Sequence, residues 1–273
     1  NMGGFGMLVK TAGETVEEMV VRAPGSLKVA QAGNPERYGF GVGRAMMNWN
    51  TRDTLEKGIQ WVHDYRAGKA PFNPMYENFT GLVDKTVPVS VHTQIYQVVM
   101  QTILMQKRDL GLDPFIDHGT FDTWRLGAEV EKREMFAIIG PRAIDVPTRG
   151  FINWSGSNPE RIQGCVAGYQ QMGTTRLGFN TDSPVIPQEE LQLQAAMGVR
   201  YGFDNKNMDA VRGLTIVPAM ACGLGDAIGS IEVGKIADLI VITGDPADPR
   251  SHVKHVWQSG ESVYDTQEES RLW

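Results

Sequence analysis

From residue 84 onward, short runs of apolar residues alternate with longer segments in which apolar residues recur every three to four positions. The first pattern predicts buried strands, and the second predicts amphipathic helices. Their alternation is typical of βα units around a parallel sheet. The predicted strands are residues 87–93, 112–118, 136–142 and 174–184, and the predicted helices are residues 94–111, 122–134, 188–202 and 207–224.

Toward the C-terminus the period of the apolar positions changes to two. Residues 235–242 and 253–264 follow this pattern and are predicted to be sheet strands that lie outside a barrel. The sequence therefore predicts two parts, residues 1–227 with the βα units and residues 228–273 with the strands outside them; the family resemblance given below implies that these are a portion of a TIM barrel and strands of a small β-sandwich. Residues 37–83 fit no βα unit and are predicted to be an insertion over one face of the barrel.

The N-terminal region gives a weaker pattern. Residues 14–35 predict a helix, a break at Pro24–Gly25 and a strand that carries Lys28. Within the insertion, residues 53–68 have the spacing of a helix.

Composition and charge narrow the class of protein. With 41% hydrophobic and 21% charged residues, the chain has the composition of a globular protein. A net charge of −6 offers no positive field for a nucleic acid. No apolar run is long enough to span a bilayer, so we expect a soluble protein without a membrane partner, in the cytoplasm or the periplasm. The two cysteines lie far apart and predict neither a disulfide framework nor a zinc ribbon.

The chemistry-bearing residues lie where predicted strands end. His92 and His118 close the first two of these strands, Asp182 closes the last, and Lys28 lies near the end of the early strand. In a TIM barrel the reacting groups lie at the C-terminal ends of the strands. Two imidazoles, a carboxylate and an amine at one rim are what a hydrolytic metal site needs.

Asp182 and Lys28 each also have a structural alternative. Asp182 lies in the sequence NTDSP, whose residue types favour turns, so it could serve only the turn. Lys28 could be a strand-end lysine that pairs with a carboxylate.

The order of a strand-end His, a second strand-end His after one βα unit and a later strand-end Asp resembles the amidohydrolase superfamily. Residues 228–246, IGSIEVGKIADLIVITGDP, are similar to the C-terminal signature of its imidazolonepropionase-like and prolidase-like members. Residues 22–37 resemble a segment of that subgroup in which a Lys precedes a Gly-x-Asn-Pro turn. The resemblance implies an α/β fold with a partial (β/α)8 TIM barrel, about strands three or four to eight, and the last strands of a β-sandwich.

The resemblance also implies a role for each residue. His92 and His118 would hold one divalent metal ion and share Lys28, as N6-carboxylysine, with a second ion. Asp182 would bind that second ion and take the proton from the attacking water. Zinc is the expected metal, and one or two ions are expected. Arg142, the last residue of the predicted strand 136–142, is by its location alone expected to clamp a substrate carboxylate.

The superfamily also uses a His-x-His pair at the end of the first barrel strand. The five histidines, at positions 63, 92, 118, 252 and 255, contain no such pair. We therefore expect a companion polypeptide that supplies the pair and the N-terminal barrel strands, in a higher oligomer.

The function expected on these grounds is hydrolysis of an amide-type C–N bond, cyclic or peptide-like, in a small-molecule substrate by metal-activated water. An alternative is a non-catalytic subunit with a structural or empty metal site. A phosphate-binding TIM barrel is a third reading, but NTDSP does not resemble the Gly-rich anion site that it requires.

Overall fold

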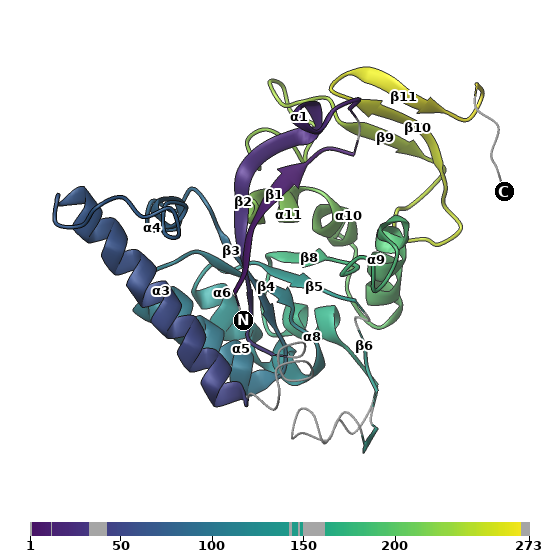
Figure 1. Cartoon of the computed structure of the whole chain (residues 1–273). Coiled ribbons are helices and arrows are strands. Elements are labelled where there is room, and N and C mark those ends of the chain that lie inside the picture. The colour runs from purple at the N-terminus through teal and green to yellow at the C-terminus, as the bar shows by residue number, and fades with distance from the viewer. Residues whose placement is uncertain are drawn as a thin grey trace.

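A computed structural model of the chain describes residues 2–11, 13–32, 43–141, 144–146, 148–149 and 162–268. Across these residues, no helix combines the length and the apolar character that crossing a membrane would require. Figure 1 shows a curved sheet with helices packed on its outer side and a smaller sheet set beyond one end.

The main sheet has the strand order β1-β2-β3-β4-β5-β8. Within this sheet, neighbouring strands among β2, β3, β4, β5 and β8 run parallel to each other, whereas β1 pairs antiparallel with β2. The strands are β1 (Met2–Val9), β2 (Val20–Ala30), β3 (Val89–Thr93), β4 (Pro114–His118), β5 (Ala137–Ile139) and β8 (Leu177–Phe179). The predicted partial barrel is confirmed, because parallel strands joined by helices form a curved sheet that does not close on itself.

Helices follow the strands as βα units require. In chain order, they are α1 (Val16–Met19), α3 (Arg44–Arg66), α4 (Phe79–Val83), α5 (Tyr96–Thr102), α6 (Gly127–Lys132), α8 (Cys165–Gln171), α9 (Leu191–Arg200), α10 (Asp209–Leu214) and α11 (Ile216–Ala221). A π-helix, Ile103–Asp109, continues α5, and 3-10 turns at Phe121–Leu126 and Gln188–Glu190 lead into α6 and α9. The helix predicted at 207–224 is divided at Thr215, whose backbone leaves the helical region.

Two clusters of buried apolar side chains pack the helices against the outer face of the sheet. One packs α5, α6 and α8 against β4, β5 and β8, and includes Ile116, Ile139 and Phe179. The other packs α3 and α4 against β2 and β3 through side chains such as Val29 and Val91. Because strand side chains alternate, burying these residues outward leaves their neighbours facing the barrel interior.

The early part of the chain differs from the prediction. The described residues of this segment, 14–32, contain one turn of helix, α1, and the strand β2 continues through Pro24–Gly25 with an irregularity in its register instead of the expected break. The antiparallel partner β1 lies so close that a Cβ on Gly25 would stand 2.7 Å from the backbone nitrogen of Leu8. The glycine therefore serves close pairing of two strands rather than a turn.

The C-terminal region forms a separate antiparallel sheet of order β11-β10-β9. Its strands are β9 (Leu239–Ile242), β10 (Val253–Gln258) and β11 (Glu261–Asp265), in the region where alternation predicts them. A two-stranded ribbon of β6 (Ile144–Asp145) and β7 (Gln163–Gly164) completes the described strands. The domain boundary at 227/228 remains a prediction.

Candidate metal centre

The strand register brings polar side chains together on the inner face of the barrel. His92 of β3 is paired with Asp117 of β4, and Asp117 is paired with Ile138 of β5. One layer below, Lys28 of β2 is paired with Ser90 of β3. Residues paired across neighbouring strands point to the same face.

The imidazoles of His92 and His118 lie side by side, with ring centroids 4.0 Å apart. By alternation His118 would point opposite to Asp117, but its φ of 83° changes the direction of the chain at the end of β4. Both rings are buried, and neither Nε2 atom has a hydrogen-bond partner among the described residues. The structure therefore supports the prediction that these two strand ends converge.

Each of the two imidazoles can present an unprotonated ring nitrogen, but the physical reason differs between them. The Nδ1 atom of His118 lies 2.8 Å from the carbonyl oxygen of Gly140, and it donates to that oxygen in the tautomer that leaves Nε2 unprotonated. For His92, the pKa is lowered to about 3, chiefly by burial and also by the neighbouring His118 and Lys28, against an opposing effect of Asp117. A neutral imidazole with a free nitrogen is the form that binds a metal ion.

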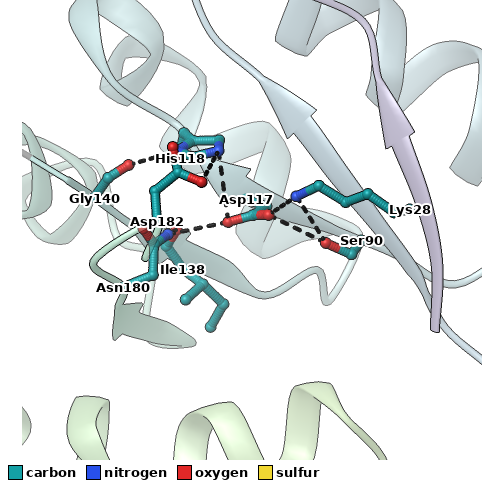
Figure 2. A network of polar contacts seen from close by, with 8 residues as sticks. All are labelled: Lys28, Ser90, Asp117, His118, Ile138, Gly140, Asn180 and Asp182. Atoms are coloured by element: carbon teal, nitrogen blue, oxygen red, sulfur yellow. Dashed lines mark hydrogen bonds and ion pairs between the residues drawn. The ribbon is translucent and has the colours of Figure 1, made fainter. Parts of the chain in front are cut away.

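Asp182 follows β8 by three residues, and its carboxylate approaches Nε2 of His118. Its Oδ1 atom lies 3.9 Å from Nε2 of His118, and its side chain is 35% exposed. The backbone of Asp182 has a φ of 51°, and its carbonyl oxygen accepts a hydrogen bond from the amide of Val185. Asp182 therefore forms the turn that its sequence predicts and also directs its carboxylate toward His118, as Figure 2 shows.

Lys28 lies two residues before the end of β2, and a carboxylate is its partner. Its Nζ atom forms an ion pair with Asp117 and lies 3.4 Å from the hydroxyl oxygen of Ser90. This is the structural alternative that the sequence left open for Lys28. Its carboxylation remains a prediction.

Asp117 is the residue of this centre that sequence reasoning missed. Its carboxylate also accepts hydrogen bonds from Ser90, at 3.1 Å, and from the side-chain amide of Asn180, at 3.1 Å. Burial acts to raise the pKa of Asp117, but His118 and Lys28 outweigh this effect and hold it below its usual value. The available signal was a charged residue one position before His118, directly after the apolar residues Phe115 and Ile116 of the same strand.

The donor chemistry of this centre fits a divalent metal ion. The 3.9 Å between His118 and Asp182 is longer than a hydrogen bond and close to the separation, about 3.4 Å, of two ligands on one tetrahedral zinc ion. Within the described part of the chain, however, no three His, Cys, Asp or Glu side chains form a group that could hold a metal ion. These residues therefore fit as part of a ligand set that needs a further contribution.

Among the described residues, the three other histidines add nothing to this centre. Arg142 falls outside the described residues, so its predicted role as a substrate clamp is not addressed. His63 is exposed on α3, far along the chain from the strand ends. In the C-terminal sheet, His255 stacks on Trp257 with centroids 3.6 Å apart, and His252 lies 3.3 Å from the hydroxyl oxygen of Thr243.

Sequence comparison finds a family match in the C-terminal part of the chain. Residues 171–264 match the model of the amidohydrolase family. The resemblance is to amidohydrolases. An amidohydrolase of Hapsidospora irregularis is 32% identical over 87 residues, which cover 32% of this chain and 9% of that protein. The imidazolonepropionase of Sphingopyxis alaskensis is 40% identical over 77 residues, covering 27% of this chain and 19% of that protein.

Solved structures extend the resemblance to nearly the whole chain. An amidohydrolase from Thermotoga maritima superimposes with a TM-score of 0.81 and 28% identity, covering 97% of this chain and 69% of that one. A Xaa-Pro dipeptidase with bound methionine has a TM-score of 0.51 and 22% identity, covering 68% of this chain and 47% of that one, and shows only the shared fold. The predicted resemblance to imidazolonepropionase-like and prolidase-like amidohydrolases is confirmed. The chain spans less than a fifth of the two curated relatives and about two thirds of the Thermotoga protein.

Proposed function

We propose that this chain supplies part of the metal centre of a hydrolase that cleaves an amide-type C–N bond, cyclic or peptide-like, in a small molecule. The observation that carries the proposal is the pair of buried imidazoles, His92 and His118, whose Nε2 atoms have no partner among the described residues. Burying a polar nitrogen without a hydrogen bond is costly, so a ligand for both nitrogens is the simplest compensation.

The roles proposed for the residues follow from their chemistry. His92 and His118 would hold a divalent ion, with zinc as the expected metal, and Asp182 would bind beside them. Lys28 would join a second ion if it were carboxylated. When bound, the metal would lower the pKa of water and polarise the substrate carbonyl.

The chain's own residues would then accept and transfer the proton of the attacking water. Asp182 is more exposed than the two histidines, with a carboxylate 3.9 Å from Nε2 of His118. A carboxylate in this position can accept the proton of the attacking water and later deliver it to the leaving nitrogen. The carbonyl of Gly140 keeps His118 oriented throughout.

A further polypeptide is part of the proposal. Among the described residues, β8 pairs only with β5, and β9 pairs only with β10, so each presents an open edge. The Thermotoga amidohydrolase extends beyond the region that this chain covers. We propose that further polypeptide completes the barrel next to β8 and contributes the His-x-His pair, in a higher oligomer.

The test is the variant His118→Ala in the protein as purified, together with every polypeptide that accompanies it. We expect at least one zinc-type metal ion per assembled unit by mass spectrometry, and loss of both the metal and of hydrolysis of a panel of cyclic amides and dipeptides in the variant. His63→Ala, an exposed histidine on α3, is the matched control and should retain both.

The competing function is a non-catalytic subunit. It is favoured by the finding that no three potential ligands in the described residues form a metal group. Under this alternative the wild-type protein contains no exchangeable metal ion, and His118→Ala folds without any change in metal content. That result would contradict the hydrolase proposal.

A further inference from the structure

The carboxylate of Asp117 connects strands that are not neighbours. It contacts Lys28 from β2, Ser90 from β3 and Asn180 at the end of β8, while Asp117 itself belongs to β4. The strand order places β3 between β2 and β4, and β5 between β4 and β8. In Figure 2 the side chains of Lys28 and Asn180 approach Asp117 from opposite sides.

This arrangement depends on the curvature of the sheet. Neighbouring strands lie about 4.8 Å apart, so β2 and β8 would be roughly 19 Å apart in a flat sheet of this order. Here their side chains share one carboxylate. Strand β2 carries Lys28, and Asp182 follows β8, two residues beyond Asn180. Both are proposed metal ligands.

A buried carboxylate in this place requires compensation. Interiors of parallel barrels are filled mainly by branched apolar side chains. The side chain of Asp117 is only 17% exposed, and an ion pair and two hydrogen bonds compensate its charge. The Oδ1 atom of Asp117 also lies 4.0 Å from Nε2 of His118, a distance too long for a hydrogen bond.

We infer that Asp117 is the positioning residue of the metal centre. By holding Lys28 and Asn180 on one anion, it sets the separation of β2 and β8 and so the positions of the ligands that these strands carry. The inference rests on the proposed function in one respect, because the consequence for metal affinity presupposes that the centre binds metal. The consequence for the strand ends does not.

The experiment compares Asp117→Asn with the control Asp113→Asn, using the protein as purified with its accompanying polypeptides. Asp113 precedes the same strand and forms a similar pair with Lys107, at 2.8 Å, away from the centre. One readout is titration of the metal-depleted protein with Co²⁺, followed by its visible absorption spectrum. The other is amide hydrogen exchange at residues 27–31 and 177–182, followed in the absence of metal.

We expect Asp117→Asn to weaken Co²⁺ binding by about 10- to 100-fold, the usual effect of removing a group that orients metal ligands, and to alter the spectrum. Exchange should accelerate at both strand ends. Asp113→Asn should change neither readout. Asn180→Ala is the milder variant, to be used if Asp117→Asn does not fold, and it should accelerate exchange at residues 177–182 but not at 27–31.

The outcomes separate the two proposals. If the wild-type protein takes up no Co²⁺ while the exchange effects appear, the metal function fails and the positioning role stands. If the wild-type protein binds Co²⁺ and Asp117→Asn binds it equally with an unchanged spectrum, the positioning role is overturned and the metal function stands. Weaker binding without any exchange effect in Asp117→Asn or Asn180→Ala would also overturn it, because Asp117 would then act as a ligand.

Discussion

At the scale of single residues, two of the proposed ligands have unusual backbone conformations. His118 and Asp182 have φ values of 83° and 51°, in a region that residues other than glycine rarely adopt. Such conformations cost of order 1–3 kcal/mol each and persist where the surroundings hold them. Here the carbonyl of Gly140 holds the ring of His118, and the turn to Val185 holds Asp182. The conformations direct both side chains toward one point, as a binding site requires.

A second buried group, outside the metal centre, makes stability depend on pH. Asp145 of β6 is 4% exposed, and its Oδ2 atom has no hydrogen-bond partner among the described residues. The pKa of Asp145 is raised to about 7, chiefly by burial; a hydrogen bond with Cys165 opposes this shift, and the charge of Asp122 adds to it. The folded protein therefore holds this carboxyl group protonated at pH values where the unfolded chain ionises it.

We expect Asp145→Asn to gain stability relative to the wild-type protein as the pH rises. Below about pH 4 the carboxyl is protonated in both states, so the favourable contribution of the neutral group is complete. Between about pH 4 and pH 7 only the unfolded chain loses the proton, and the wild-type free energy of unfolding falls by up to about 4 kcal/mol relative to the variant. Urea unfolding of both proteins at several pH values measures the difference.

Asp84→Asn provides a control of opposite sign. The guanidinium of Arg66 lowers the pKa of Asp84, so the stability that this pair contributes is lost as the pH falls. A difference between Asp145→Asn and wild type that stays constant from pH 4 to pH 7 would contradict the role assigned to Asp145.

At the scale of elements, the long helix α3 is fitted to the sheet by a glycine. Leu55 and Val62 of α3 pack with Val29 and Val91 of the strands. At Gly58, on the same buried side, an added Cβ would lie 2.1 Å from a ring carbon of Phe79 in α4. The absence of a side chain there lets α4 lie directly on α3.

We expect Gly58→Ala to destabilise the protein even though alanine is the better helix former. The change gains about 1 kcal/mol in helix propensity but forces the ring of Phe79 to move, and overpacking of this kind costs about 1–3 kcal/mol. The net loss should appear as a lower denaturation midpoint in urea. Gln60→Ala, at an exposed position of the same helix, should leave the midpoint nearly unchanged, and a rise in the midpoint for Gly58→Ala would refute this account.

At the scale of the whole molecule, apolar side chains gather near the open edge of the C-terminal sheet. Ile240 of β9 is 61% exposed, and Ile231 and Val233, which precede β9, are almost fully exposed. An exposed apolar edge strand is a site for pairing with another chain. The C-terminal sheet also contacts the end of β1. The Nζ atom of Lys10, which follows β1, lies 2.6 Å from the hydroxyl oxygen of Ser259, which follows β10.

We expect Ile240→Lys to weaken assembly with the proposed further polypeptide, because a charge on β9 opposes burial of that edge. Native mass spectrometry should show the assembled species of the wild-type protein and a larger fraction of free chain in the variant. Met75→Lys, a change at an equally apolar and 73% exposed residue outside both edges, should leave assembly intact. A wild-type chain that is folded, monomeric and loaded with metal by itself would refute the proposal.

The sequence by itself determined the elements whose signals are local. Alternation and helical spacing predicted the strands that became β3, β4, β5 and β8, and the order of His92, His118 and Asp182 indicated which strand ends converge. These predictions hold because the burial of a regular element leaves its period in the neighbouring residues. The glycine-rich strand β1 carried no such period and was missed.

Tertiary structure alone decided which polar groups share a partner. The pairing of Lys28 with Asp117, and the approach of Asn180 to the same carboxylate, join residues up to 152 positions apart through the register and curvature of the sheet. No local pattern encodes that distance. The continuation of β2 through Pro24–Gly25 was likewise decided by its partner strand, because pairing with β1 on both sides of these residues, at Arg22 and Ser26, keeps the strand extended across an irregularity in the ladder.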